Sequence, residues 1–559
     1  MSAFFQVLRS FGYSDAQAAI EDAAAHCSTI EEALRYIPVD PLPHSRRDPA
    51  NVPDVYCIDE SSSSDDDSDC QIVEDSGPSV HFRGDTLFLN ELSGIHPSHT
   101  TRYVDFYRLF STTYSKEPDK DITHILLTSY VHSESMLGFV LSHHPDAEIT
   151  FLSHLSPEES SRDPVVLNDG KHQILFPSFP THGYHCFHPK LILIRFPDRL
   201  RVVISSSNLM EEDWTEWAQC VWMQDFFLAP EGELRVAEKK MDLEFRTQLI
   251  AFLRACGCPD ERLFALLRGV FFRGLRVRLV GSVARVLRGK KMSEFGHLRL
   301  RAILQSLGEY YAAVHVDGGV WSGCVKCDAV KRAGKGGDAK RSGAVNSKPT
   351  NTKESNTEVP LPLLSLCSSI GSPYKNWLCS ILRSCHGGRA LPPTAELSRC
   401  LEVVFPTEQF VRDSRIGEEM AGSLIFKHKN FEAGRYSRAF LKQYRNVAGR
   451  EGTLPHAKYL MPVPTEQRPR LPWVYAGSHN LTRSAWGALE KDGAQFRMTN
   501  YECGVVLLPK NYIDWMNGDL ASQDHPQGLQ EDDLCEPIDL PFVVPYKSYY
   551  STDTPFCVE

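Results

Sequence analysis

The sequence predicts an α/β protein made of two similar halves, with a small helical module and an acidic linker in front of them. Short apolar runs of strand length alternate with polar stretches over most of the chain, which is typical of α/β folds. One motif, His-x-Lys followed by two apolar strands and Asn-Leu, occurs twice, about 270 residues apart. A length of 559 residues also exceeds what one compact core accommodates.

Residues 1–38 have the pattern of a small helical bundle. Two capping boxes, Ser14–Gln17 and Ser28–Glu31, each combine a Ser oxygen with an acid or amide side chain three residues later. Apolar residues recur between them, and Phe11-Gly12-Tyr13 makes the first turn. The segment resembles a ubiquitin-associated domain. A helical adaptor with no known partner is the alternative.

Residues 39–82 are predicted to be a disordered acidic linker, because prolines and the run SSSSDDDSD cannot bury apolar surface. Within it, Val55, Tyr56 and Ile58 precede a row of acids. This pattern resembles a SUMO-interacting motif, which would add a strand to the edge of a partner's sheet. A plain solvated linker is the alternative, since acidic linkers with a few aliphatic residues are common.

The acidity of the chain belongs to this N-terminal arm. Residues 1–83 hold 5 Lys/Arg and 16 Asp/Glu, whereas the remainder holds 55 of each and is neutral. A local basic groove for a polyanion is therefore compatible with the whole-chain charge of −11.

The first α/β half is predicted at 83–315 and the second at 359–559. A basic, disordered insertion at 316–358 separates them, because 323–354 contains 8 Lys/Arg, 3 Asp/Glu and almost no large apolar residue. The strands predicted in the first half are 124–130, 148–154, 191–196, 200–206 and 220–228.

Composition argues against several classes of protein. No apolar run approaches the roughly 18 residues of a membrane span, and the N-terminus lacks the pattern of a secretory signal. The 16 Cys residues show no disulfide-framework spacing, which favours reduced thiols of the cytosol or nucleus. The pair Cys324 and Cys327 has no second pair, so a zinc site is not expected.

The repeated motif carries the candidate chemistry. In an extended strand, residues i and i+2 point to the same face, so the His and Lys of each copy lie together. If the halves face each other, both copies converge on one point. The two copies consist of His188, Lys190 and Asn208 in the first half, and of His456, Lys458 and Asn480 in the second half.

These residue types suit phosphoryl transfer. Lysine charge and asparagine N–H groups would stabilise the equatorial oxygens of a pentavalent phosphorus. One histidine can attack phosphorus while the other protonates the leaving oxygen. No metal or other cofactor is required, because the lysines neutralise the phosphate.

The two motifs resemble those of the phospholipase D superfamily. In the common form of that motif, four residues follow His-x-Lys and an Asp comes next, whereas this chain has Arg195 and Val463 at these places. The pattern His-x-Lys…Asn instead resembles the tyrosyl-DNA phosphodiesterase I family. The similarity covers about 85–559 without the insertion and includes the segments 204–214, 295–304, 366–380, 403–407, 477–493 and 500–509.

The resemblance implies a fold and an activity. The fold would be two pseudo-symmetric phospholipase D-like α-β-α halves packed face to face. The enzyme would be a monomeric, metal-independent DNA repair hydrolase that cleaves the 3′-phosphotyrosyl bond left on DNA by topoisomerase I, and also removes other 3′ adducts. His188 would form a phosphohistidine link to DNA, and His456 would act as acid and then as base.

The resemblance also implies roles for five residues outside the motifs. Gln219 matches an active-site Gln, and Glu502 matches the Glu that orients the second motif. Tyr184 stands where the family has an aromatic residue that stacks on a DNA base, and Ser369 and Ser372 stand where it has contacts to the DNA backbone.

Two other classes of function stay open. Another phospholipase D-like phosphodiesterase, such as a nuclease or lipid hydrolase, would be favoured by an intact Asp after each motif, and neither is present. A binding protein with a dead site would be favoured by loss of a motif His or Lys, and all four are present. We further expect nuclear location, and an N-terminal arm at 1–80 that binds ubiquitin or SUMO on DNA–protein adducts.

Overall fold

The structure is a computed structural model. The predicted helical module, acidic linker and basic insertion lie outside the residues it describes. It describes residues 86–95, 102–113, 116–154, 163–167, 170–179, 185–228, 239–314, 361–372, 374–389, 397–432, 438–465, 470–521, 525 and 529–559.

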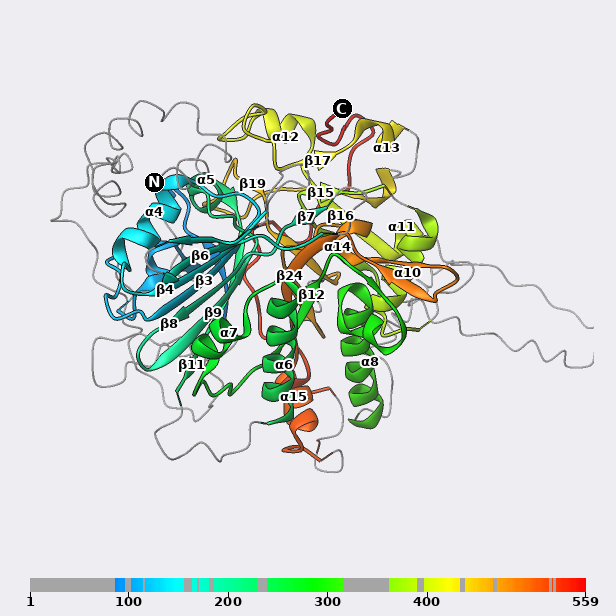
Figure 1. The fold of residues 1–559 in the computed structure, drawn as a ribbon. Coiled ribbons are helices and arrows are strands. Elements are labelled where there is room, and N and C mark those ends of the chain that lie inside the picture. Colours follow the sequence, from blue (N-terminus) through cyan, green and yellow to red (C-terminus); the bar gives the residue numbers. More distant parts are fainter. Residues whose placement is uncertain are drawn as a thin grey trace, which may run out of the picture.

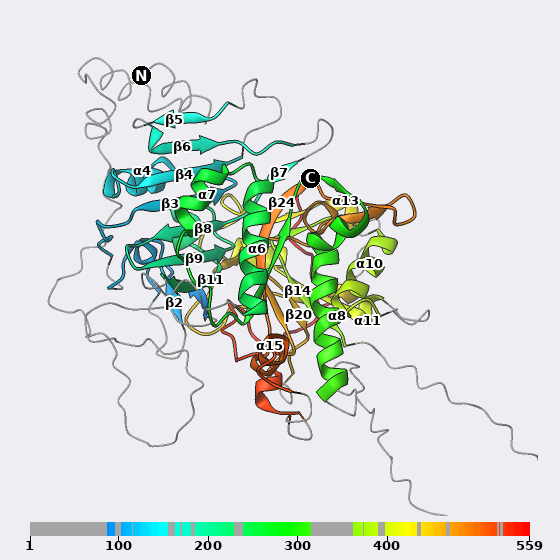
Figure 2. The same ribbon diagram turned by 60° about the horizontal axis from the view of Figure 1, so that its bottom comes forward.

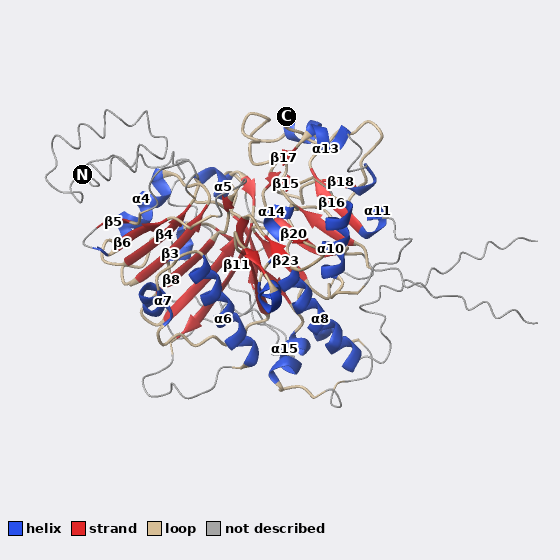
Figure 3. Ribbon diagram, turned by 45° about the vertical axis from the view of Figure 1, so that its right-hand side comes forward, coloured by secondary structure: helices blue, strands red, loops and turns tan. Residues whose placement is uncertain are grey.

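Two large mixed sheets lie next to each other, and helices cover their faces (Figures 1 and 3). The first is a nine-stranded sheet that contains all five strands predicted for the first half. In spatial order its strands are β2 (Tyr103–Val104), β1 (Thr86–Asn90), β11 (Cys220–Phe227), β9 (Arg199–Ser205), β8 (Leu191–Arg195), β3 (His124–Ser129), β4 (Glu148–Ser153), β6 (His172–Leu175) and β5 (Val165–Leu167).

The second sheet has eight strands and follows the same plan. One of the eight, the short strand β7 (Cys186–Phe187), lies off the main path and pairs with β24. In spatial order the other strands are β12 (Val277–Ser282), β24 (Asn500–Leu507), β21 (Val474–Gly477), β20 (Lys458–Pro462), β14 (Leu363–Leu366), β16 (Leu401–Phe405) and β18 (Leu441–Gln443).

The two sheets repeat one order and one set of strand directions. The path β1-β11-β9-β8-β3-β4-β6 corresponds to β12-β24-β21-β20-β14-β16-β18. Along both paths, four antiparallel pairs are followed by two parallel pairs. The duplication that the motifs indicate therefore extends to the whole sheet.

The division between the sheets falls earlier than the predicted boundary at residue 315. β12 pairs antiparallel with β24, from Val277 opposite Leu507 to Ser282 opposite Glu502. Helix α8 (Gly296–Val314) packs in the same core as residues of the second sheet. The segment predicted at 316–358 thus interrupts the second repeat instead of separating two halves, because β12 before it and β14 after it belong to one sheet.

The remaining elements are short strands and helices. The short strands are β10 (Trp217–Ala218), β13 (Val286–Leu287), β15 (Ser369–Ile370), β17 (Ile425–Phe426), β19 (Leu454–Pro455), β22 (Ala488–Glu490) and β23 (Gln495–Arg497). The helices are α4 (Glu134–His143), α5 (Glu211–Thr215), α6 (Lys240–Ala255), α7 (Asp260–Leu267), α10 (Lys375–Cys385), α11 (Leu397–Cys400), α12 (Glu408–Arg412), α13 (His428–Glu432), α14 (Arg483–Trp486) and α15 (Lys510–Asn517), with 3₁₀ turns η2 (Tyr107–Phe110), η4 (Gly289–Glu294), η5 (Arg438–Phe440) and η7 (Glu531–Asp533). None of the helices in these described stretches is long and apolar enough to cross a membrane.

Helix α6 lies at the junction of the two sheets (Figure 2). Its buried Phe245 and Leu249 belong to one apolar cluster with Trp222 of β11 and Leu279 of β12. Burial of such side chains contributes about 2 kcal/mol each. The two repeats therefore share one hydrophobic core and are not independent domains.

Each half also extends a short strand toward the other. β7 follows the first-half loop but pairs with β24, and it places Phe187 opposite Tyr501. β10 pairs with β19, and it places Ala218 opposite Pro455. These two pairings fix the chain just before His188 and His456, so they decide where both motifs meet.

Candidate active site

The two His-x-Lys motifs are anchored by backbone hydrogen bonds across the interface between the halves. The N–H of His188 donates to the carbonyl oxygen of Tyr501 at 3.0 Å, and the N–H of His456 donates to Ala218 at 2.9 Å. Lys190 and Lys458 each donate to the carbonyl oxygen of the histidine in their own motif. Both lysines also act electrostatically on both histidines, so the two motifs form one site.

His188 is oriented by a carboxylate of the opposite half. Its Nδ1 lies 2.8 Å from Oε2 of Glu502, which is itself buried on β24. Ser478 and Asn500 donate to the two oxygens of this carboxylate, at 2.6 Å and 3.0 Å. The expectation that Glu502 orients the second motif is wrong, because it contacts the histidine of the first motif.

His456 is oriented by an amide of the first half. Its Nδ1 lies 3.1 Å from Oε1 of Gln219, and that oxygen accepts a second hydrogen bond from Ser206 at 2.7 Å. Gln219 has no exposed surface. The ring of Trp217 meets that of His456 edge-on, with centroids 5.9 Å apart, and closes this side of the site.

Gln219 and Glu502 occupy equivalent places in the two repeats. Each accepts a hydrogen bond from a serine two residues before a motif Asn, which is Ser206 or Ser478. The same serine oxygens accept the backbone N–H groups of the next residues, Cys220 and Cys503, at 3.0 Å each. The family resemblance predicted both residues for the site, but it did not reveal that each contacts the histidine of the opposite motif.

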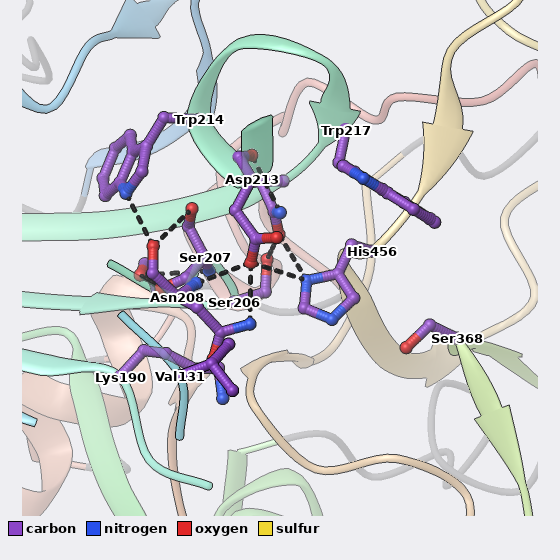
Figure 4. A network of polar contacts seen from close by, with 12 residues as sticks. Val131, Lys190, Ser206, Ser207, Asn208, Asp213, Trp214, Trp217, Ser368 and His456 are labelled. Atoms are coloured by element: carbon purple, nitrogen blue, oxygen red, sulfur yellow. Dashed lines mark hydrogen bonds and ion pairs between the residues drawn. The ribbon is translucent and has the colours of Figure 1, made fainter. Parts of the chain in front are cut away.

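Asp213 is a buried acid of the site that the sequence pattern did not reveal. Its Oδ2 accepts from the backbone and side-chain N–H groups of Asn208, at 2.7 Å and 2.8 Å. The same oxygen lies 3.6 Å from Nδ1 of His456, and Figure 4 shows the carboxylate between these two residues. Asp213 directly follows Glu211 and Glu212 in the sequence. From the sequence alone, the three acids have the pattern of a solvent-exposed acidic turn.

Asn480 is held through its amide oxygen, whereas Asn208 is held through its amide NH₂ group. Its Oδ1 accepts from the backbone N–H groups of Ser368 and Ser369, at 3.2 Å and 2.9 Å, and from the Ser368 hydroxyl at 3.3 Å. With its oxygen fully engaged in this way, the NH₂ group of Asn480 remains to donate to a ligand.

Burial shapes the electrostatics of the site. Lys190 and Lys458 are about fully buried, and desolvation lowers the pKa of Lys190 to about 8 and that of Lys458 to about 7. Desolvation and the neighbouring lysines hold the pKa of His188 and His456 well below the usual value. Burial raises the pKa of Glu502. A bound anion would reverse the loss of positive charge on the lysines.

The structure describes two of the three residues that were predicted to contact DNA. Ser369 and Ser372 are half-buried next to the loop after β21, where Gly371 N–H donates to Leu481 at 3.0 Å. The hydroxyl of Ser372 donates to Oδ1 of Asn430 at 3.2 Å. Tyr184 lies outside the described residues.

No group of three or more His, Cys, Asp or Glu side chains that could hold a metal ion occurs among the residues described by the structure. At the centre of the site lie the two motif lysines, the two motif histidines and the carboxylates of Asp213 and Glu502. This donor set suits an anion better than a cation.

A sheet that is duplicated within one chain, and that brings two His-x-Lys motifs to a shared interface, defines a protein of the phospholipase D-like class. The model of the tyrosyl-DNA phosphodiesterase family matches residues 116–550. The chain belongs to this family.

Curated relatives agree with this assignment. "Tyrosyl-DNA phosphodiesterase 1" of Arabidopsis thaliana is 26% identical over 348 residues, which are 59% of this chain and 47% of the relative. The match thus spans about half the length of that relative. The protein of the same name from Drosophila melanogaster is 22% identical over 85% of this chain and 73% of its own. The "Probable tyrosyl-DNA phosphodiesterase" of Schizosaccharomyces pombe is 22% identical over 76% of this chain and 82% of its own.

The fold is also that of a solved relative. The crystal structure of the yeast tyrosyl-DNA phosphodiesterase superimposes with a TM-score of 0.55 and 18% identity. The match covers 85% of this chain and 99% of the yeast chain. At this identity the likeness establishes the phospholipase D-like α/β fold.

Proposed function

We propose that this protein hydrolyses the phosphodiester between a DNA 3′ end and a tyrosine left by topoisomerase I, and that it also removes other 3′ adducts. The observation that carries the proposal is the reciprocal pairing of His188 with Glu502 and of His456 with Gln219. Membership of the tyrosyl-DNA phosphodiesterase family supplies the substrate class.

Two lysines and two asparagines hold the phosphate in this proposal. Lys190 and Lys458 neutralise its charge, and Asn208 and Asn480 donate N–H groups to its oxygens. The lysines need no metal ion to do this, because they are buried next to the reacting centre, where charge is poorly screened.

His188 is the nucleophile of the first step. Because Nδ1 faces the Glu502 carboxylate, it carries the proton, and the lone pair of Nε2 is free to attack phosphorus. The new N–P bond forms as the bond to the tyrosine oxygen breaks, and His456 gives its Nε2 proton to that oxygen. The products are free tyrosine and a covalent phosphohistidine link to DNA.

His456 acts as the base of the second step. Its Nε2, now without a proton, takes one from a water molecule that attacks phosphorus. The N–P bond breaks, His188 leaves, and DNA with a 3′-phosphate is released. The neutral Gln219 holds His456 by Nδ1 without a directly bonded charge, which suits a group that alternates between acid and base.

Cleavage of an oligonucleotide with a 3′-phosphotyrosine, measured in excess EDTA, tests the proposal. The wild type should cleave it, His188→Ala should neither cleave nor form an adduct, and His456→Ala should accumulate the covalent DNA adduct. His143→Ala, at an exposed histidine of α4, is the matched control and should behave as wild type.

Other substrates distinguish the proposed activity from that of a nuclease or a lipid hydrolase. An unmodified oligonucleotide and phosphatidylcholine vesicles should remain uncut under the same conditions. Faster cleavage of either one, or activity that EDTA abolishes, would replace the proposed function by that of a nuclease, a lipid hydrolase or a metal-dependent enzyme.

The N-terminal arm has a separate proposed role. Residues 1–80 would bind ubiquitin or SUMO on modified DNA–protein adducts in the nucleus, on the basis of their sequence patterns. Deletion of 1–80 should leave cleavage of a short oligonucleotide intact and weaken recruitment to damaged chromatin. Equal loss of both would contradict this role.

A further inference from the structure

The two repeats place their acids differently around the histidines. The residue five positions after the motif Asn is Asp213 in the first repeat and Ala485 in the second. The residue that directly accepts the histidine Nδ1 is Gln219 in the first repeat and Glu502 in the second. Each histidine therefore faces one carboxylate, but only His188 touches it directly.

Asp213 is built into the His456 side of the site. Its side chain is 9% exposed, and its Oδ2 lies 3.6 Å from Nδ1 of His456. The backbone oxygen of Asp213 also accepts from Nε2 of Gln219 at 2.9 Å. Asp213 thus also positions Gln219, which contacts His456.

Asp213 also fixes the amide of Asn208. Two N–H groups of Asn208 donate to one carboxylate oxygen, so the amide oxygen must point away from it. That oxygen is buried without a hydrogen-bond partner. If the amide turned over, its oxygen would face the negative carboxylate, which is unfavourable.

We propose, on the basis of the function proposed above, that Asp213 is a positioning residue that stabilises the protonated form of His456 and holds the amide of Asn208. It does not touch the reacting atoms. Its charge acts through the imidazole ring across 3.6 Å.

The charges around His456 explain why this acid is needed. The side chains Lys458, Lys190 and His188, which act electrostatically on His456, are cationic or become so on protonation. All three oppose protonation of His456. Among the described residues, Asp213 is the acid whose carboxylate lies near the ring of His456, with Oδ2 3.6 Å from Nδ1, so it is placed to pair with the ring once the ring is protonated.

The distance between the Asp213 carboxylate and the His456 ring suits a histidine that must both release and accept a proton. A carboxylate hydrogen-bonded directly to Nδ1, as Glu502 is to His188, keeps the proton on Nδ1 and leaves Nε2 unprotonated. At 3.6 Å, with the neutral Gln219 in direct contact, the attraction supports the imidazolium without preventing proton release. His456 can then serve in both chemical steps.

The first test is the pH profile of kcat for Asp213→Asn. Without the charge, His456 is protonated only at lower pH, so the optimum should move down by about one pH unit, and kcat should fall about 10–100-fold. KM should change less than about threefold, because phosphate binding depends mainly on the lysines. Glu212→Gln, the exposed neighbour on α5, is the matched control and should keep the wild-type profile.

The decisive test moves the carboxylate instead of removing it. In Asp213→Asn/Gln219→Glu, the acid stands on the residue that accepts Nδ1 of His456, as in the other repeat. The optimum should return to or above the wild-type value. A purely structural role of Asp213 predicts no such rescue.

The outcomes are distinguishable. An unshifted optimum in Asp213→Asn, whatever its rate, overturns the inference. If that variant does not fold, Asp213→Ala takes its place, because the second repeat accommodates Ala485 at the equivalent position. A wild type that does not cleave the 3′-phosphotyrosyl substrate instead overturns the proposed function itself.

Discussion

His188 Nδ1 lies 2.8 Å from Glu502 Oε2, although 314 residues separate them in the chain. The reverse pairing joins His456 of the second repeat to Gln219 of the first, at 3.1 Å. Each repeat thus supplies the histidine for its own motif and the orienting residue for the other. The site depends on the pairing of β7 with β24 and of β10 with β19 across the two halves.

Loss of the Glu502 charge should slow the first chemical step. In Glu502→Gln, His188 keeps a hydrogen-bonding partner but loses the carboxylate that favours its attack, so tyrosine release should slow about 10–100-fold. Single-turnover release of labelled tyrosine measures this step. Glu432→Gln, at an exposed acid on α13, is the control, and equal rates in both variants would contradict the assignment.

Loss of the Gln219 amide should prolong the covalent intermediate. In Gln219→Ala, the His456 ring loses its direct acceptor, so activation of water should suffer more than attack by His188. The DNA–protein adduct should persist roughly tenfold longer on a denaturing gel. The exposed Gln409→Ala serves as control. An adduct lifetime like that of the wild type would show that Gln219 does not act on His456.

The buried lysines should give kcat/KM an alkaline limb. Burial lowers the pKa of Lys458 to about 7 and that of Lys190 to about 8, so the free enzyme loses positive charge as pH rises through this range. kcat/KM for a substrate with a blocked tyrosine should fall above pH 7 and be maximal below it. Lys458→Arg, which stays charged, should move the limb upward. A flat profile from pH 6.5 to 8.5 would contradict the lowered pKa values.

Adjacent serines should affect different kinetic constants. Ser369→Ala and Ser372→Ala should each raise KM for DNA about fivefold, the value of one hydrogen bond, with kcat nearly unchanged. Ser368→Ala removes a hydroxyl that donates to Asn480, so it should lower kcat instead. Steady-state kinetics on oligonucleotides of two lengths checks this, and a kcat effect of Ser369→Ala would place its hydroxyl at the reacting phosphate.

Buried neutral histidines should make the fold acid-sensitive. Desolvation lowers the pKa of His297 to about 3 and that of His479 to about 4, whereas both titrate near 6.5 when unfolded. The unfolded chain therefore binds more protons between pH 6.5 and 4, and stability falls as pH falls through this window, by about 1 kcal/mol per pH unit for each histidine.

Thermal unfolding at pH 7 and pH 5 measures this effect. His297→Gln should lose less stability between pH 7 and pH 5 than the wild type does, because it lacks one histidine that takes up a proton on unfolding. Its thermal unfolding midpoint should therefore differ less between the two pH values. An unchanged difference would show that His297 does not remain neutral in the folded state. Glu502 and Asp213, whose pKa values burial raises, act in the opposite sense and are common to both proteins.

Local patterns in the sequence predicted much of this structure. The apolar runs 191–196 and 200–206 form the central strands β8 and β9. Such runs can be recognised from a few neighbouring residues, because a short stretch rich in apolar and β-branched residues favours a buried strand. The recurrence of His-x-Lys and Asn-Leu predicted six residues of the site. Each strand-like run, and each copy of the motif from its His to its Asn, spans no more than 25 residues.

Long-range relationships were beyond these patterns. The pairing of β12 with β24, and of Glu502 with the first motif, depends on which strands become neighbours in three dimensions. Asp213 was hidden in the acidic turn Glu211–Thr215. Comparison of NLMEEDW with NLTRSAW, position by position, would have revealed it, because only one repeat carries an acid before the Trp.

The exchange of strands between the repeats has a consequence for protein synthesis. A ribosome that has translated through β11 has already made His188, Lys190 and Asn208, but the partner of His188 at position 502 comes much later. The nascent first repeat consequently lacks the carboxylate that orients His188, the proposed nucleophile. If the proposed function holds, competence to cleave a 3′-phosphotyrosyl bond should arise only once β24 has been made and has paired with β7, and a chain truncated before β24 should be inactive.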